Sequence, residues 1–414
     1  MTRQRILMAG GGSAGHVNPL LAVSAKLAER GTDVLALGTK VGLEAELVPQ
    51  AGFELLTIDK IPAPRRPGRA ALQFLPKLRR TIARVEEYLR EREIDAVMGF
   101  GGYVSAPAYI AARRRKIPTL IHEQNVRAGW ANKLGARSAD RVGLTFANTK
   151  LRASRGRTSV TGLPLRTQIE RLAKLRQDPQ SRTRVREQAA KKLHLDPNQP
   201  TLLITGGSLG AKHLNEVMVA AASAFDKRLQ VLHLTGKGKS EGVEQAVRSC
   251  GFEGRWIVRE YASNMADFFA ASDLVVCRSG AGTVCELTAL GIPAVYVPLP
   301  IGNGEQKLNA AAQVKAGGAY LFADSEFDES VVRNWVAPLL ASPSRLESMA
   351  AASAQLGRVD AAGVLADMVS EVLHERAGAP RTPGAPRTPG ATHTPGATHN
   401  PGATHTDPDG KEAR

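Results

Sequence analysis

The stretch Gly10 to His16, GGGSAGH, follows the short apolar run ILMA and carries glycines at positions 10, 12 and 15. A glycine-rich turn between a parallel strand and a helix lets backbone N–H groups approach an anion at the positive end of the helix dipole. The stretch therefore indicates phosphate binding. Its G-x-G-x-x-G spacing is also the dinucleotide-binding fingerprint.

A dinucleotide site needs, in addition, an acidic residue at the end of the second strand to hold the ribose hydroxyls. The segment expected to form that strand, DVLALGTK, ends in Gly38, Thr39 and Lys40, whereas Asp33 stands at its beginning. The acid is at the wrong edge of the sheet. The sequence thus argues against NAD, and we expect no cofactor.

The stretch CRSGAGTVCE, from Cys277 to Glu286, is a second candidate for phosphate chemistry. Its glycines can wrap a diphosphate, and Glu286 follows in the first turns of the expected helix, where its two oxygens could accept both hydroxyls of a ribose. The alternative is a tight turn whose carboxylate only favours the helix N-terminus. Acidic pairs of D-x-D type are absent before the C-terminal tail, so we expect no metal site.

Short aliphatic runs alternate with helical patterns, which predicts parallel sheets built from βαβ units. The expected strands are RILMAG, DVLALG, DAVMGF and TLIHEQ, followed later by TLLITGG, QVLHLTG, RWIVREY, DLVVC and AVYVPL. A polar helical segment from about residue 163 to 200 separates the two groups. We predict an α/β protein with two Rossmann-like domains, at residues 1–163 and 164–355. A helix at about 356–376 is expected to pack back on the first domain.

The composition narrows the functional class. The chain has 414 residues, 43% of them hydrophobic, and a formal net charge of +16, which favours an anionic partner. Aromatic residues make up only 5%, and no zinc-finger spacing is present, so we do not expect nucleic acid to be the partner. No apolar run approaches the roughly 18 residues of a membrane-spanning helix, and ILMA is too short for a signal peptide. We therefore expect a cytoplasmic protein.

Two further features bear on the class. Cys250, Cys277 and Cys285 are odd in number and lack C-x-x-C spacing, which argues against disulfides and a zinc site. Residues 377–414 repeat a six-residue unit of the type GAPRTP or GATHTP, which cannot bury apolar surface and is expected to be a disordered tail.

Taken together, the motifs resemble those of the MurG family, the UDP-N-acetylglucosamine:N-acetylmuramyl-(pentapeptide)-pyrophosphoryl-undecaprenol N-acetylglucosamine transferases. The resemblance covers about residues 3 to 375, in the expected order and spacing. The motifs are GGGSAGH, GFGGYVSAP, HEQN, GLPLR, GGSLGA, CRSGAGTVCE and EQKLNA. It implies the GT-B fold, with two Rossmann-like domains facing a cleft. It also implies an inverting, metal-independent transfer of GlcNAc from UDP-GlcNAc to the C4 hydroxyl of MurNAc in lipid I, which gives lipid II.

The resemblance also implies a binding site for UDP-GlcNAc. Uracil would lie near Ala262, the diphosphate near Ser208 and the loop from Ala281 to Thr283, and the ribose on Glu286. Gln306 and Asn309 would meet the GlcNAc hydroxyls, and Arg166 matches a donor-site position. The expected set also includes residues of the N-terminal loops and further positions of the helix around Glu286. These are Ser13, Ala14, Gly15, Asn125, Gly282, Val284 and Cys285.

His16 is the candidate general base in this resemblance. It stands in the first turn of a helix, where the dipole disfavours the imidazolium, so the ring should be neutral at pH 7 and able to take the acceptor's proton. A structural role in a helix-turn hydrogen bond is the alternative. Glu123 ranks second, either orienting or replacing His16.

Some positions depart from the commonest family pattern. Leu163 stands where many members have asparagine, Glu305 where a second glutamine can stand, and Ser13 in place of threonine. The serine keeps the hydroxyl. The other two leave open a GT-B glycosyltransferase with another lipid or natural-product acceptor. A UDP-GlcNAc 2-epimerase is disfavoured because it needs carboxylates in the cleft, and a non-catalytic UDP-sugar-binding paralogue is a further alternative.

Because lipid I carries a polyprenyl tail, we expect peripheral attachment to the anionic cytoplasmic face of the cell membrane. Basic residues gather in PRRPGRAALQFLPKLRR and from Arg113 to Lys116, both in the first half of the chain. Leu72, Phe74 and Leu75 could dip into the interface. The alternative is that these apolar residues pack into the core and the arginines form a solvated face.

Overall fold

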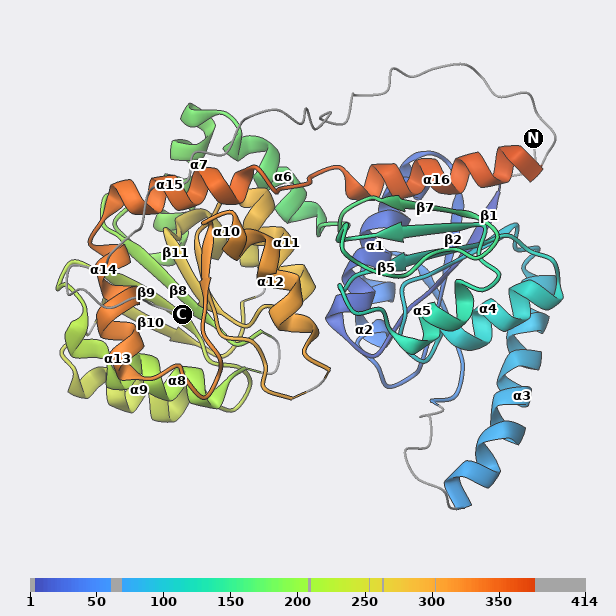
Figure 1. Ribbon diagram of the computed structural model, residues 1–414, viewed down its shortest axis with the longest axis horizontal. Coiled ribbons are helices and arrows are strands. Elements are labelled where there is room, and N and C mark those ends of the chain that lie inside the picture. The colour runs from blue at the N-terminus through green and yellow to red at the C-terminus, as the bar shows by residue number, and fades with distance from the viewer. Residues whose placement is uncertain are drawn as a thin grey trace, which may run out of the picture.

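The structure is a computed structural model, and it describes residues 4–60, 69–207, 210–252, 254–262, 264–301 and 303–376, without the side chains of residues 69–73. It contains two parallel sheets, each covered by helices on both faces (Figure 1). The tail expected to be disordered, residues 377–414, lies outside the described residues.

The first sheet has seven strands in the order β3-β2-β1-β4-β5-β6-β7, and every pair in it is parallel. Its strands are β1 (Arg5–Ala9), β2 (Asp33–Gly38), β3 (Glu54–Thr57), β4 (Ala96–Gly99), β5 (Thr119–Glu123), β6 (Arg141–Leu144) and β7 (Arg157–Val160). The helices of this half are α1 (Ala14–Glu29), α2 (Glu44–Gln50), α3 (Arg69–Glu91), α4 (Ser105–Arg114) and α5 (Trp130–Gly135).

The second sheet repeats the plan with six parallel strands in the order β10-β9-β8-β11-β12-β13. Its strands are β8 (Thr201–Thr205), β9 (Gln230–Leu234), β10 (Trp256–Arg259), β11 (Leu274–Cys277), β12 (Ala294–Tyr296) and β13 (Ala319–Leu321). Two helices precede it, α6 (Thr167–Arg176) and α7 (Pro179–Leu193). The others are α8 (Lys212–Ala220), α9 (Ser240–Ser249), α10 (Met265–Ala271), α11 (Ala281–Leu290), α12 (Glu305–Lys315), α13 (Glu329–Val331), α14 (Ala337–Leu340), α15 (Pro343–Ala354) and α16 (Ala361–Arg376), with short 3-10 and π segments at Ala222–Ala224 and Val332–Val336.

The strand order places one topological switch point in each sheet. The chain leaves β1 toward β2 and β3 and returns to β4 on the other side of β1, and it does the same around β8 and β11. In open parallel sheets, ligands bind outside the carboxyl ends of the strands at such points. The glycine-rich stretches after β1, β4, β8 and β11 all lie there, so the topology gathers them into candidate binding sites.

The last helix crosses back to the first half of the molecule. Figure 1 shows α15 lying over the second sheet and α16 over the first. Leu365 and Val369 of α16 are fully buried in the core shared with α1. Ion pairs join Arg30 to Asp367 at 2.7 Å and Arg141 to Glu375 at 2.7 Å. The last helix thus ties the C-terminal end of the described chain back to the first half of the molecule. The domain boundaries at residues 163 and 355 stay a prediction.

The sequence interpretation of the elements can be compared with the structure. All the expected strands are present, and α6 and α7 occupy the predicted helical junction. Four strands were not predicted: β3, β6, β7 and β13, which are short and lie at or near sheet edges. Cys250, Cys277 and Cys285 are free thiols. Among the described residues, no helix combines the length and the apolar character needed to cross a membrane.

Candidate functional site

The glycine-rich loop after β1 encloses a carboxylate from the chain itself. Glu44, the first residue of α2, is fully buried. Its Oε2 accepts a hydrogen bond from the N–H of Gly12 at 2.9 Å, and its Oε1 accepts from the N–H and hydroxyl of Thr39 at 3.0 and 2.8 Å. A Cβ on Gly11 or Gly42 would lie 2.5 or 2.1 Å from this carboxylate, so glycine is needed at both positions. One amide of the dinucleotide fingerprint is therefore already bonded within the protein.

The environment of Glu44 favours its ionised form. Burial raises the pKa of this carboxyl, but the hydrogen bonds donated by Gly12 and Thr39 lower it, and the net pKa lies below the ordinary value of 4.5. The hydroxyl of Tyr103 extends this network by donating to Thr39 Oγ1 at 3.2 Å. Glu44 thus holds the loop after β1, the end of β2 and the loop after β4 together.

His16, the third residue of α1, is held by the same loop. Its Nδ1 lies 3.0 Å from the carbonyl oxygen of Gly11 and 3.2 Å from Ser13 Oγ. A carbonyl only accepts, so in the neutral ring Nδ1 carries the hydrogen and Nε2 keeps its lone pair. Burial lowers the pKa of His16, against the raising effects of the Gly11 carbonyl and of Glu123 and Glu44. The ring is neutral at pH 7, and no described residue hydrogen-bonds to Nε2.

The loop after β4 closes over His16. Gly101 and Gly102 both adopt positive φ, at 89° and 76°, a region that favours glycine. A Cβ on Gly101 would lie 3.3 Å from His16 Nε2, and one on Gly102 would lie 2.7 Å from the carbonyl oxygen of Gly11. The glycines of GFGGYVSAP therefore allow one loop to pack directly on the other.

Glu123 lies at the end of β5 and is bonded to the loop that follows. The side chain is only 2% exposed. Its Oε1 accepts from the N–H of Asn125 at 3.0 Å, and its Oε2 accepts from the N–H of Gly129 at 3.0 Å and from Asn132 Nδ2 at 2.9 Å. These contacts tie both oxygens to the loop after β5, which supports the first of the two expected roles of Glu123, that of orienting its surroundings, over replacement of His16 as the base.

The helix α11 presents its amino end at the second switch point. Gly280 precedes the helix in an extended conformation, and the amides of Ala281, Gly282 and Thr283 occupy the first turn, where they have no intrahelical acceptor. They can donate to a diphosphate, as expected. The N–H of Val284 donates to Gly280 O at 3.0 Å and its side chain packs in the core, so Val284 has no unbonded amide to offer, and its place among the ligands stays a prediction.

Cys285 also faces the interior. Burial, together with the negative charge of Glu286, raises the pKa of this thiol to about 12. The thiol is protonated and packs against the core around α11. Cys285 therefore contributes an uncharged, apolar side chain to this helix.

Arg166 and Glu286, which the sequence placed in the same site without contact, form an ion pair. Arg166 Nε donates to Glu286 Oε1 and Arg166 Nη2 donates to Glu286 Oε2, both at 2.8 Å. Burial lowers the pKa of Arg166, but the carboxylate of Glu286 raises it, and the net effect is a pKa above the ordinary value of an arginine. Each carboxylate oxygen has a second lone pair, so Glu286 can still accept from a ribose while Arg166 fixes its orientation.

The loop after β5 meets α12 across the two halves of the molecule. Asn309, 1% exposed, accepts from the N–H of Val126 at 3.0 Å and donates to Asn125 Oδ1 at 3.1 Å. Arg127 donates to the carbonyl of Asn303 nearby. Asn125 and Asn309, each predicted from a different motif, are thus brought into direct contact at the junction of the two domains.

The remaining predicted residues have varied surroundings. Ser13 precedes α1, and Ala14 and Gly15 begin it. Ala262 is buried after β10, and Gln306 Oε1 accepts from the N–H of Leu299 at 3.0 Å. Ser208 lies outside the described residues.

Leu163 and Glu305, two of the three departures from the family pattern, have simple structural surroundings. Leu163 is 4% exposed and belongs to the core. Glu305 begins α12, and its Oε2 accepts from the N–H of Asn303 at 3.3 Å, while Asn303 Oδ1 accepts from the N–H of Glu305 at 3.2 Å. The carboxylate of Glu305 is thus part of a helix cap, where a negative charge is stabilising.

Comparisons with known proteins agree over nearly the whole chain. Residues 6–144 match the glycosyltransferase family 28 N-terminal domain, and residues 201–365 match the glycosyltransferase family 28 C-terminal domain. The UDP-N-acetylglucosamine–N-acetylmuramyl-(pentapeptide) pyrophosphoryl-undecaprenol N-acetylglucosamine transferase of Bifidobacterium adolescentis is 47% identical over 392 residues. These cover 91% of this chain and 99% of that protein. The chain belongs to the MurG family.

Solved structures agree with this membership. The crystal structure of MurG from Acinetobacter baumannii is 30% identical and superimposes with a TM-score of 0.71, over 89% of this chain and 99% of that one. A UDP-GlcNAc 2-epimerase from Neisseria meningitidis, at 16% identity and a TM-score of 0.64 over 89% of this chain and 100% of that one, shares the fold alone. The expected fold class, α/β with two domains of parallel strands as in GT-B enzymes, is confirmed.

Proposed function

We propose that this member of the MurG family transfers GlcNAc from UDP-GlcNAc to the C4 hydroxyl of MurNAc in undecaprenyl-pyrophosphoryl-MurNAc-pentapeptide, lipid I, and so forms lipid II. The identity of 47% with a transferase of that name, over 91% of this chain, carries the proposal. The site geometry supports it. A neutral histidine whose Nε2 is bonded to no described residue, and a helix amino end whose first amides have no intrahelical acceptor, supply the chemistry that such a transfer requires.

On the acceptor side, His16 Nε2 takes the proton of the attacking hydroxyl. The resulting oxygen nucleophile attacks C1 of GlcNAc from the face opposite UDP, which inverts the anomeric centre. Gly11 O holds Nδ1–H at 3.0 Å, which fixes the tautomer that keeps Nε2 unprotonated. The loop shaped by Glu123 brings Asn125 beside the donor sugar.

On the donor side, the bond from C1 to the diphosphate breaks and UDP leaves as an anion. The first-turn amides of α11 donate to its phosphates, and Glu286, held by Arg166, accepts from the ribose hydroxyls. Gln306 and Asn309 bind hydroxyls of GlcNAc, and uracil lies against the backbone near Ala262. Positioned donors of this kind contribute about 3 kcal/mol each to stabilising a developing charge.

A transfer assay tests the proposed reaction. We expect labelled UDP-GlcNAc and a lipid I analogue to give a lipid-linked disaccharide and UDP in equal amounts. Release of UDP and formation of the disaccharide are measured together by chromatography. Free N-acetylmannosamine or UDP-N-acetylmannosamine in place of the disaccharide would identify an epimerase, and disaccharide formation only with a different lipid acceptor would identify another glycosyltransferase.

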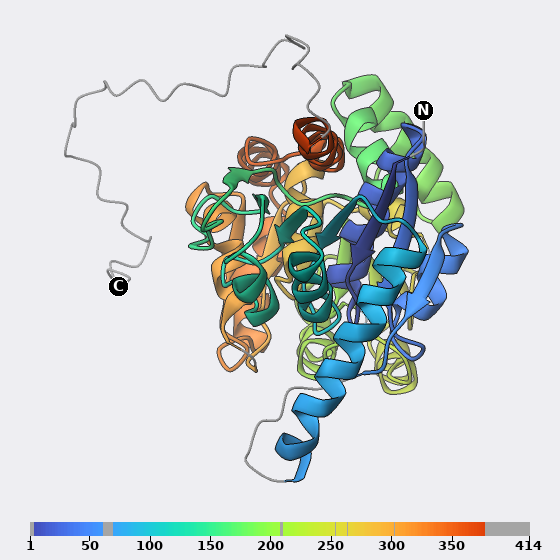
Figure 2. The ribbon, with the colours of Figure 1, turned by 90° about the vertical axis from the view of Figure 1, so that its right-hand side faces the viewer.

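The acceptor's lipid tail requires access to a membrane, and α3 is the element that we assign to this contact. Figures 1 and 2 show the amino end of α3 projecting from the first domain. Leu75 in this part of the helix is 59% exposed, and Lys77, Arg79 and Arg80 around it are also exposed. Phe74 and the 52% exposed Trp130 line a small common hollow beside it. We infer peripheral attachment to the anionic cytoplasmic membrane face through this end of α3.

Flotation with vesicles measures this attachment. We expect the full chain to float with phosphatidylglycerol vesicles, to be released by salt, and not to float with phosphatidylcholine alone. Replacing both Arg79 and Arg80 by glutamine should weaken binding about 30-fold, since each basic residue near an anionic surface contributes about 1 kcal/mol. Arg184→Gln, on the exposed face of α7 in the other domain, is the matched control. Equal binding by all three proteins would contradict the assignment of α3.

A further inference from the structure

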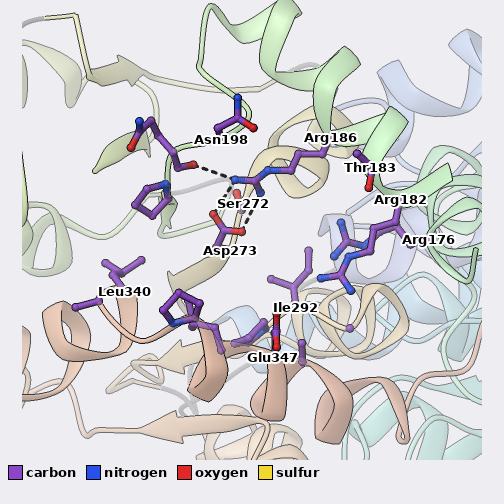
Figure 3. Close-up of a pocket in the computed structure, with 18 of the residues that line it drawn as sticks. Arg176, Arg182, Thr183, Arg186, Asn198, Ser272, Asp273, Ile292, Leu340 and Glu347 are labelled. Carbon is purple, nitrogen blue, oxygen red and sulfur yellow. Dashed lines mark hydrogen bonds and ion pairs between the residues drawn. The ribbon is translucent and has the colours of Figure 1, made fainter. Parts of the chain in front are cut away.

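A second candidate site lies in the C-terminal half, away from the loops described above. A cavity of about 500 Å³ is lined by α6, α7, α14 and α15 and by the segments that lead into β8, β11 and β12 (Figure 3). Pro200, Asp273 and Pro293 in its wall directly precede these strands. The proposed donor loops follow the opposite ends of β8 and β11. The cavity is therefore at the other edge of the sheet and separate from the UDP-GlcNAc site.

Two arginines in this cavity have unused donors. Arg176 Nε donates to the carbonyl of Leu290 at 2.9 Å, which fixes the guanidinium, while its terminal nitrogens have no hydrogen bond to any described residue. The side chain of Arg182 forms no hydrogen bond or ion pair with a described residue. Figure 3 shows both guanidinium groups directed into the cavity. Five N–H donors in a planar fork suit the oxygens of a phosphate.

Arg176 and Arg182 form no ion pair with an acidic side chain among the described residues, and the charges around Arg176 show the effect. Burial and the positive charges of Arg182 and Arg186 lower the pKa of Arg176 and Asp273 raises it, which together bring the pKa to about 10. Arg176 is still protonated at pH 7. An anion bound between Arg176 and Arg182 would relieve the repulsion that depresses this pKa.

The other charged groups of the cavity are largely satisfied. Arg186 donates to both oxygens of Asp273 at 2.9 Å, so these two charges compensate each other. Arg228 is paired with Asp226 at 3.2 Å. Glu347, on α15 at the opposite wall, forms no ion pair with a described residue. The charges left for a ligand are two guanidinium groups and one carboxylate on the α15 wall.

We propose that this cavity binds a phosphate monoester, with the phosphate between Arg176 and Arg182. Its volume is larger than one phosphate requires and lies in the range of ligand pockets. Ile292, Leu340 and Leu346 supply an apolar wall for the esterified group. The same chemistry is present in a soluble phosphate ester and in a lipid headgroup such as phosphatidic acid, and the experiment below separates these two sources.

The position of the cavity links it physically to the donor site. Arg176 is the last residue of α6, and Leu290, which accepts from it, is the last residue of α11. Arg166 directly precedes the opposite end of α6, and it forms an ion pair with Glu286 in the middle of α11, about one turn before Leu290. A bound phosphate would therefore brace the same helix pair that carries part of the donor site, and it should raise the unfolding temperature of the whole chain.

Calorimetric titration with glycerol 3-phosphate, at constant ionic strength, tests the proposal. The full chain is used with and without UDP, so that any binding at the donor loops is recognised by its loss when UDP is present. In parallel, the chain is floated with phosphatidylcholine vesicles that contain or lack phosphatidic acid. Arg182→Gln, whose side chain has no partner to lose, should bind the responding probe about tenfold more weakly.

Two further variants complete the design. Arg184→Gln, on the same helix and equally exposed, should bind as the unchanged protein does. Glu347→Gln should bind about threefold more tightly, because the unpaired carboxylate is removed. A response to glycerol 3-phosphate identifies a soluble ester, and a response to phosphatidic acid alone identifies a headgroup. The proposal is overturned if neither probe binds, if UDP abolishes binding, or if Arg182→Gln and Arg184→Gln behave alike.

Discussion

Replacing His16 by asparagine should lower kcat about 10²- to 10⁴-fold while leaving the fold and the KM for UDP-GlcNAc nearly unchanged. The amide Nδ2 of asparagine can occupy the place of His16 Nδ1 and donate to the carbonyl of Gly11, so the loop contact seen at 3.0 Å is kept. Only the Nε2 lone pair is removed. The magnitude is that of general-base assistance by a positioned side chain. Steady-state kinetics with a lipid I analogue measure it.

The pH dependence of kcat provides an independent check on the same group. Burial lowers the pKa of His16 below 6.5. The base acts only when neutral, so the rate should be constant through pH 7 and fall about tenfold per pH unit once the pH is below that lowered pKa. The acid limb should be absent in His16→Asn. A structural role alone would leave this variant with nearly full activity and an unchanged acid limb, and that result would remove His16 from the reaction.

The two sheets and their switch points could be predicted from local sequence patterns. The alternation of aliphatic runs and helices predicted the two parallel sheets, because each βαβ unit is encoded within a short stretch. The glycine-rich motifs then marked the switch points. The four unpredicted strands are short, so their apolar patterns are weak.

Contacts between residues far apart in the sequence could not be predicted from these local patterns. Arg166 and Glu286 are 120 positions apart, and Asn125 and Asn309 are 184 apart. The motifs named all four residues but gave no sign that they pair. The three donors to Glu123 could not be predicted for a related reason: a carboxylate after a strand can act as a base or bind backbone amides, and the sequence does not show where those donors lie.

Glu44 is the clearest residue that the sequence did not indicate. It lies in VGLEAELVP, where an acidic residue in the first turn of a helix has an ordinary explanation. Its function depends on Gly12, which is 32 positions away, and on the space left by three glycines, since Gly38 also approaches its side chain. The dinucleotide argument noted that no acid follows β2 directly. The structure shows that an acid nearby fills the loop from within.

Replacing Glu44 by alanine should therefore destabilise the protein by about 3 to 4 kcal/mol, because the N–H of Gly12 and two donors of Thr39 lose a charged acceptor in a buried site. Chemical denaturation measures this change. Glu46→Ala is the matched control on the same helix. The side chain of Glu46 is exposed and, among the described residues, accepts a hydrogen bond only from Gln50, so we expect a change within about 0.5 kcal/mol.

The pH dependence of this stability should have a defined sign. The folded-state pKa of Glu44 is lowered, so its stabilising contribution is present above the ordinary value of 4.5 and is lost as the pH falls through the lower folded-state value. The difference in stability between the unchanged protein and Glu44→Gln should therefore be constant near neutral pH and shrink in acid. A difference that is equally large at both extremes would mean that Glu44 acts through its packing and not through its charge.

Because the carbonyl of Gly11 orients His16 from the same loop, Glu44→Gln should also lower kcat more than KM. Loss of stability without loss of kcat would separate the integrity of the loop from the placement of the base.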